Sequence, residues 1–133
     1  MSPKQQEKLF KKEYAIELMK IAEGDLETAE VITSCKKGRA ENGFFMAQQA
    51  IEKALKAVLI AQGIKVPLVH DLGVLLAKLP EKLEPPFGYE LSELNQFAAA
   101  RRYEEGTYEV SFEDLSEVIT KSKEMLTWAK NYL

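Results

Sequence analysis

Hydrophobic positions recur along this chain at steps of three and four residues, the period of an amphipathic α-helix. The first such stretch runs without a proline from Lys4 to Lys37, and Gly38 follows a cationic last turn. Its apolar stripe consists of Leu9, Phe10, Tyr14, Leu18, Ile21, Ala22, Leu26, Ala29 and Ile32. We therefore predict one long N-terminal helix with this stripe turned inward.

A second long helix is predicted from Ala40 to Gln62, where Gly63 ends it. Pro67 makes the following link extended, because its ring disfavours helical backbone in the residue before it. The apolar face of this second helix consists of Phe44, Ala47, Ile51, Ala54, Leu55 and Val58.

Shorter helices are predicted downstream, from Asp71 to Leu79 and from about Tyr89 to Glu104. Ser111 and Asp114 have the spacing of a capping box and predict a last helix that continues to the C-terminus. The inward face of that helix consists of Leu115, Val118, Ile119, Ser122, Leu126 and Ala129. The chain is thus expected to be all-α, a single domain over residues 1–133 forming an antiparallel up-and-down bundle of four to five helices.

Composition narrows the class of protein further. An apolar content of 46%, with 7 Gly and 5 Pro, excludes a disordered, collagen-like or turn-rich β chain. The net charge of −3 gives no general attraction to nucleic acid or anionic membrane. Cys35 and His70 are single residues of their kinds, which excludes an internal disulfide and a Cys/His zinc site. Because the sequence has no signal-like or membrane-spanning stretch, we expect a cytoplasmic protein. We also expect no metal site.

Polar side chains cover the arc of the second helix opposite its apolar face. This polar arc consists of Gln48, Gln49, Glu52, Lys53 and Lys56. One interpretation is a binding surface for a phosphate or an ATP-class nucleotide, with the lysines as point charges and the amides as hydrogen-bonding groups. The alternative is a solvated helix face that carries an ordinary i,i+4 pair of Glu52 and Lys56.

Two other places carry candidate chemistry. Asp71 is placed to cap the third helix, and His70 beside it is either a structural histidine or a base or phosphate ligand. Arg101, Arg102 and Tyr103 follow a run of alanines; they can oppose the helix dipole or bind phosphate and stack on a base. Arg102, His70 and Tyr103 are the candidates for a catalytic role, and the common phosphate-loop, dinucleotide, zinc-protease and serine-hydrolase motifs are absent.

In combination these segments resemble the HEPN family of small helical bundles. The resemblance covers nearly the whole chain and is strongest in the pattern Gln-Gln-x-x-Glu-Lys-x-x-Lys from Gln48 to Lys56. The segments that carry it are Ala22 to Ala29, Phe45 to Ala57, His70-Asp71-Leu72 with Leu75-Leu76, and Ala100 to Tyr103.

The resemblance implies a nucleotide-binding or accessory protein that works with a small nucleotidyltransferase in a toxin–antitoxin-like pair, and it implies a homodimer. Other members are metal-independent ribonucleases with an Arg followed after four to six residues by a His. Neither Arg101 nor Arg102 has such a His, and Met46 stands where relatives often carry one. We therefore expect a non-catalytic accessory subunit; an RNA-cleaving toxin with an atypical site and a purely structural homodimer remain the alternatives.

Overall fold

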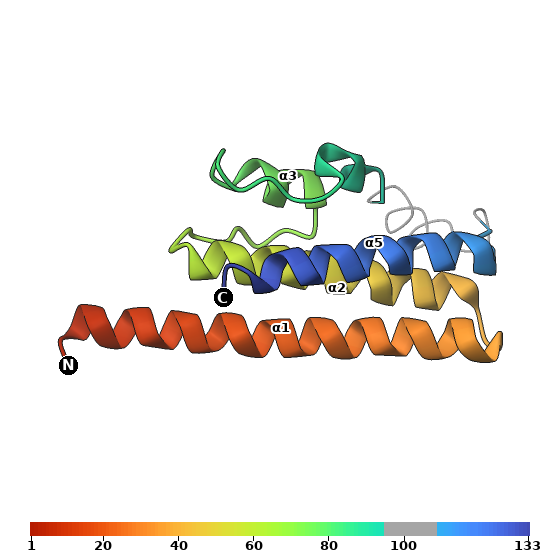
Figure 1. Ribbon diagram of the computed structural model, residues 1–133, viewed down its shortest axis with the longest axis horizontal. Coiled ribbons are helices and arrows are strands. Elements are labelled where there is room, and N and C mark those ends of the chain that lie inside the picture. Colours follow the sequence, from red (N-terminus) through yellow and green to blue (C-terminus); the bar gives the residue numbers. More distant parts are fainter. Residues whose placement is uncertain (95–108) are drawn as a thin grey trace.

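The computed structural model describes residues 1–94 and 109–133 and consists of three long helices with two short ones laid over them (Figure 1). No strand occurs in these two ranges. The prediction of an all-α bundle that begins with two long helices is confirmed. The elements are α1 (Pro3–Cys35), α2 (Ala40–Ala61), α3 (Leu72–Ala77), the 3-10 helix η1 (Gly88–Glu93) and α5 (Phe112–Lys130).

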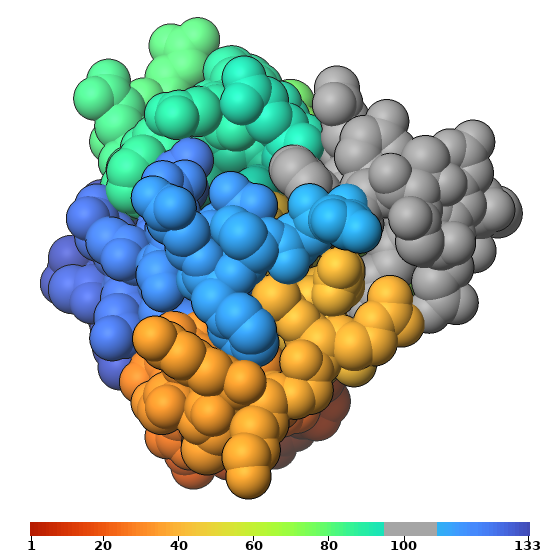
Figure 2. All heavy atoms as spheres, turned by 90° about the vertical axis from the view of Figure 1, so that its right-hand side faces the viewer, coloured from red at the N-terminus to blue at the C-terminus, as the bar shows by residue number. Residues whose placement is uncertain are grey.

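The three long helices do not alternate in direction along the chain. α1 and α2 are antiparallel, whereas α5 runs in the same direction as α2 (Figure 1). The backbone N–H of Val110 donates to Glu41 at the start of α2, and Lys130 at the end of α5 pairs with Glu23 of α1. Between α2 and α5 the described residues include α3 and η1, which have six residues each and lie over the long helices (Figure 1). Figure 2 shows the end of the bundle where α1 ends and where α2 and α5 begin.

Local capping fixes the helix ends close to the predicted places. Ser111 and Asp114 form the predicted capping box, with both hydrogen bonds at 3.0 Å. Asp71 caps α3 as expected, because its carboxylate accepts from the backbone N–H of Val74. α1 ends at Cys35, where Lys36 adopts the left-handed conformation and its N–H donates to the carbonyl of Ile32.

The core is centred on α2, and its predicted apolar face is buried at every position. The predicted inward face of α5 is buried as well. It includes Ser122, whose hydroxyl donates to the backbone carbonyl of Ala47 at 3.2 Å and so joins α5 to α2. Trp128 and Tyr132 are partly buried at the end of α5, with ring centroids 5.2 Å apart.

The inward face of α1 differs from the prediction. Leu9, Phe10, Tyr14 and Ile21 are exposed, and Phe10 retains 67% of its accessible surface. α1 has 33 residues against 22 in α2, so its first turns, with Leu9, Phe10 and Tyr14, extend past the other long helices and cannot be covered by them (Figure 1). Ile21 lies between the buried Met19 and Ala22, on a side of α1 that its neighbours leave exposed. The residues of α1 that do face the core are Ala15, Met19, Ala22, Leu26 and Ala29.

The predicted helix from Tyr89 to Glu104 is corrected at its beginning. Gly88–Glu93 is a 3-10 helix, in which Leu91 is buried. It follows Phe87 and Gly88, which both have positive φ, so the chain enters it from a tight turn. The remainder of that prediction, from residue 95 on, lies outside the described residues. None of the helices in residues 1–94 and 109–133 has the length and apolar character that a membrane crossing requires.

Gly43 provides a test of this packing. A Cβ at Gly43 would lie 2.8 Å from a methyl of Leu115, which is fully buried. We expect Gly43→Leu to reduce the free energy of unfolding by about 1–3 kcal/mol through overpacking. The matched control is Gly24→Ala, whose new methyl meets no atom within 4 Å. It is expected to stabilise the protein by about 0.5–1 kcal/mol. Urea unfolding measures both, and equal stability of the two variants would contradict this account.

Candidate functional site

The predicted polar arc of α2 is not an open surface. Gln48 and Glu52 are each only 3% exposed, and Gln49, Lys53 and Lys56 are partly buried. The arc divides between two neighbours of α2, because Lys53 reaches α1 whereas Glu52 meets the segment that leads into α3. The interpretation as a solvated helix face is therefore wrong in its exposure, and the chemistry depends on what each side chain contacts.

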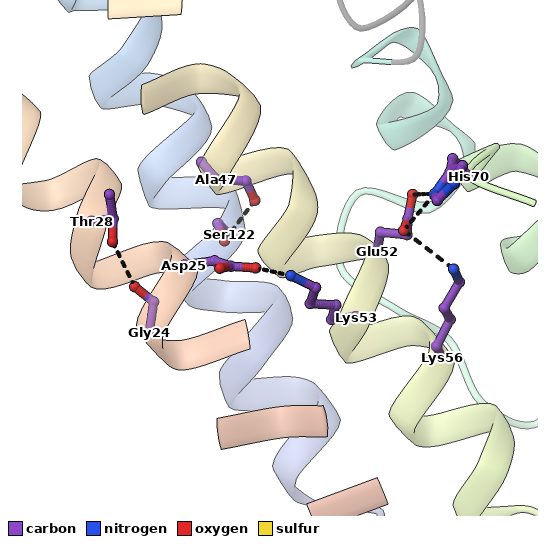
Figure 3. Close-up of polar contacts among 9 residues, drawn as sticks. All are labelled: Gly24, Asp25, Thr28, Ala47, Glu52, Lys53, Lys56, His70 and Ser122. Atoms are coloured by element: carbon purple, nitrogen blue, oxygen red, sulfur yellow. Dashed lines mark hydrogen bonds and ion pairs between the residues drawn. The ribbon is translucent and has the colours of Figure 1, made fainter. Parts of the chain in front are cut away.

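Glu52 is the centre of the site. Its two carboxylate oxygens lie 3.2 and 3.1 Å from Nδ1 of His70, and its Oε2 lies 3.2 Å from Nζ of Lys56 (Figure 3). The expected pair of Glu52 and Lys56 is thus present, and His70 adds a second partner from a different part of the chain. One buried carboxylate anchors two nitrogen groups that both reach the surface. We call Glu52, Lys56 and His70 the carboxylate cluster.

The direction of the histidine ring follows from this contact. An ionised carboxylate only accepts hydrogen bonds, so Nδ1 of His70 must carry the proton that it donates to Glu52. The side chain of His70 remains 62% exposed, and within the described part of the chain its Nε2 makes no hydrogen bond. Asp71, which caps α3, holds the adjoining backbone. The free edge of the ring therefore faces outward.

Lys56 also keeps donor capacity. An ammonium group has three N–H donors, and Glu52 takes one of them. The side chain of Lys56 is 18% exposed, so its stem packs on the protein while its head remains within reach of a ligand. Lys56 and the outer nitrogen of His70 together can contact an anionic or hydroxyl-bearing group.

Lys53 belongs to a different contact. It pairs with Asp25 of α1, and both side chains are largely buried (Figure 3). A pair of this kind fixes the register between α1 and α2, because an unpaired partner would be left without solvation. Lys53 thus joins α2 to α1, and its place in the predicted phosphate-binding set stays a prediction. Asp25 is the polar residue that the sequence-based interpretation missed, although it lies in the segment from Ala22 to Ala29.

Gln48 precedes Glu52 by one helical turn and shows an unusual feature. Its Oε1 is buried without a hydrogen-bond partner among the residues that the structure describes. A buried acceptor in this state costs free energy and gains from any donor that reaches it. Gln48 therefore stays with the carboxylate cluster as a candidate ligand contact, and partly buried Gln49 lies beside it on α2.

Arg101, Arg102 and Tyr103 fall outside the described residues, so their relation to the carboxylate cluster stays a prediction. Within residues 1–94 and 109–133, no three His, Cys, Asp or Glu side chains are grouped so that they could hold a metal ion. Cys35 is exposed as a free thiol.

The fold and the cluster define a small helical bundle in which Glu52 of the central helix anchors a lysine of the same helix and a histidine that precedes α3. The chain matches the model of the HEPN domain over residues 15–132 and belongs to the HEPN family. The family predicted from sequence is thereby confirmed.

Two solved structures resemble the chain. TT1696 from Thermus thermophilus aligns with a TM-score of 0.76 and 24% identity, covering 90% of this chain and 98% of the other. ST0689, described as an archaeal HEPN homologue, aligns with a TM-score of 0.68 and 29% identity over 88% and 95% of the two chains. The first likeness concerns the fold alone. No curated protein matches the chain significantly.

Replacing Glu52 tests the cluster. We expect Glu52→Ala to lower the free energy of unfolding by about 1–3 kcal/mol, because two charge-assisted hydrogen bonds are lost. Nitrogen-15 NMR of the imidazole should place the proton of the neutral ring on Nδ1 in the original protein, and this preference should disappear in the variant. The chain has one His, so the signals belong to His70 alone. Exposed Glu27 provides the control, since Glu27→Ala should change neither quantity.

Proposed function

We propose that this protein is a non-catalytic, nucleotide-binding accessory subunit that works with a small nucleotidyltransferase. The observation that carries the proposal is the carboxylate cluster, in which a buried Glu52 presents Lys56 and His70 at the surface. Membership of the HEPN family supports the same role, because the resemblance implies such a partnership.

The arrangement suits a nucleotide better than a bare phosphate. Glu52 offsets part of the positive charge, so a small anion gains little from the site as a whole. A nucleotide adds groups that the cluster can recognise one by one. Lys56 can donate to a phosphate oxygen, the outward Nε2 of His70 can accept from a hydroxyl or amino group, and Gln49 can pair with an edge of the base.

An ATP-binding experiment tests the ligand. Lys56→Ala is expected to weaken ATP at least tenfold in isothermal titration calorimetry, since a charge-assisted hydrogen bond contributes about 1.5–3 kcal/mol. Lys65→Ala removes an exposed lysine that makes no ion pair with the cluster and should leave the affinity unchanged. If ATP does not bind the original protein, or binds it and Lys56→Ala equally, the nucleotide site is not at this cluster.

The partner is tested separately by purifying the tagged protein from its native host and identifying what accompanies it by mass spectrometry. A nucleotidyltransferase recovered in near-equal amount supports the accessory role. Recovery of RNA without that enzyme, or of a homodimer alone, contradicts it.

One observation favours RNA cleavage as a second candidate function. The buried carboxylate of Glu52 orients the ring of His70 and leaves Nε2 facing solvent, which is how a carboxylate positions a histidine general base. In this function His70 would take the proton of a ribose 2′-hydroxyl as its oxygen attacks the adjacent phosphorus and the bond to the 5′-oxygen breaks. Arg102 would stabilise the phosphorane charge.

RNA incubated with the pure protein distinguishes the two functions. Cleavage by a ribonuclease of this kind should fall at least 100-fold in His70→Ala and in Arg102→Ala, as expected for loss of a base or of charge stabilisation. Products should carry a 2′,3′-cyclic phosphate. Equal cleavage by the original protein and both variants would identify a contaminant and exclude this function.

A further inference from the structure

The inward side of α1 changes in character where the helix leaves the bundle. Ala15, Met19 and Ala22 lie on the buried side of α1. The same side continues toward the N-terminus at three- and four-residue steps as Lys11, Lys8 and Lys4, which are exposed. Lysines thus replace small apolar residues over the part of α1 that α2 does not reach. The lysines therefore lie on the side of α1 that faces the core further along the helix.

These lysines border a groove. A cavity of about 720 Å³ lies between the first turns of α1, the end of α2 and the last residues of the chain. Lys4, Lys8, Lys11 and Lys12 line its α1 side. Ile60, Ala61 and Tyr132 form an apolar portion of the opposite side. The groove combines a cationic wall with an apolar wall.

The charge of the groove is largely uncompensated. Glu7 also lines it and pairs with Lys11 at 3.1 Å, both side chains being exposed. Lys4, Lys8 and Lys12 make no ion pair within the described residues. Among the side chains, four lysines less one glutamate leave +3 at this place, and the terminal carboxylate of Leu133 reduces this to +2 in a protein whose net charge is −3. Such a wall favours an acidic ligand.

We propose that this groove binds an acidic amphipathic α-helix of a partner protein. The extension of α1 from Pro3 to Tyr14 has the length of about 18 Å at ~1.5 Å per residue, enough for three turns of a second helix. Such a helix would follow the line of α2 beyond Gly63. Its apolar side would cover Ile60, Ala61 and Tyr132, and its carboxylates would pair with the lysines.

A peptide fits these walls better than RNA does. The apolar wall would stay uncovered beneath a phosphate backbone. Among the described residues that line the groove there is also no arginine, the side chain that presents a planar fork of donors to phosphate. The HEPN match begins at residue 15, so the lysines lie outside it, and the inference is independent of the carboxylate cluster.

The test is a selection from a phage-displayed library of random 18-residue peptides, with counter-selection on the variant Lys8→Glu/Lys11→Glu. The expected peptides carry Glu or Asp and apolar residues at helical spacing. Synthesised and labelled, they should bind the original protein at least tenfold more tightly than the variant in fluorescence anisotropy. Lys78→Glu/Lys82→Glu has the same net charge and reverses two exposed lysines elsewhere, so it should bind like the original protein.

The milder variant Lys4→Gln/Lys8→Gln removes two positive charges without reversing them, so it keeps the test valid if charge reversal disturbs folding. It should also bind the peptides more weakly than the original protein does. Four outcomes overturn the proposal. No peptide of this pattern is enriched, or the enriched peptides bind all variants equally. A 12-nucleotide oligouridine binds more tightly than the peptides and depends on the same lysines. Sedimentation velocity detects self-association that Lys8→Glu/Lys11→Glu abolishes, which would make a second copy the occupant.

Discussion

The enclosure of α2 by its neighbours is the constraint on which the rest of this structure depends. Ala15, Ala22 and Ala29 recur every seven residues on the buried side of α1 and bring small side chains to that side. With α1 and α5 packed against it, α2 has little surface left for water. A buried charge on α2 must therefore find its partner in the protein, and Glu52 does so by holding Lys56 and His70.

Much of the fold follows from sequence because local signals and the core agree. The capping residues Ser111 and Asp71 act where predicted, and the apolar faces of α2 and α5 are buried as expected. Periodicity failed at Phe10 and Tyr14 for a physical reason: it identifies the apolar positions of a helix without showing where the neighbouring helix ends.

The candidate site was predictable in its residues on α2 and in the pair of Glu52 and Lys56, but not in its contacts with other elements. Glu52, Lys53 and Lys56 were grouped correctly on one arc of α2, but an angular position does not tell which neighbour covers it. Lys53 turns to Asp25, 28 residues earlier in the chain, and Glu52 meets His70, 18 residues later. Both separations cross a turn between elements, so both contacts depend on the tertiary structure. The HEPN resemblance supplied the family, whereas the geometry of the cluster required coordinates.

Because α1 is longer than its neighbours, its first turns are less stable than the part that packs in the bundle. Before Ala15 every side chain is exposed, and the backbone there is supported by the Ser2 capping box and by the pair of Glu7 and Lys11. A helical segment this short is marginal on its own, so its amides exchange with solvent through fraying from the end. Beyond Ala15 the amides are protected by the packed bundle. The boundary between slow and fast hydrogen exchange should thus fall inside a continuous helix, at the place where its neighbours end.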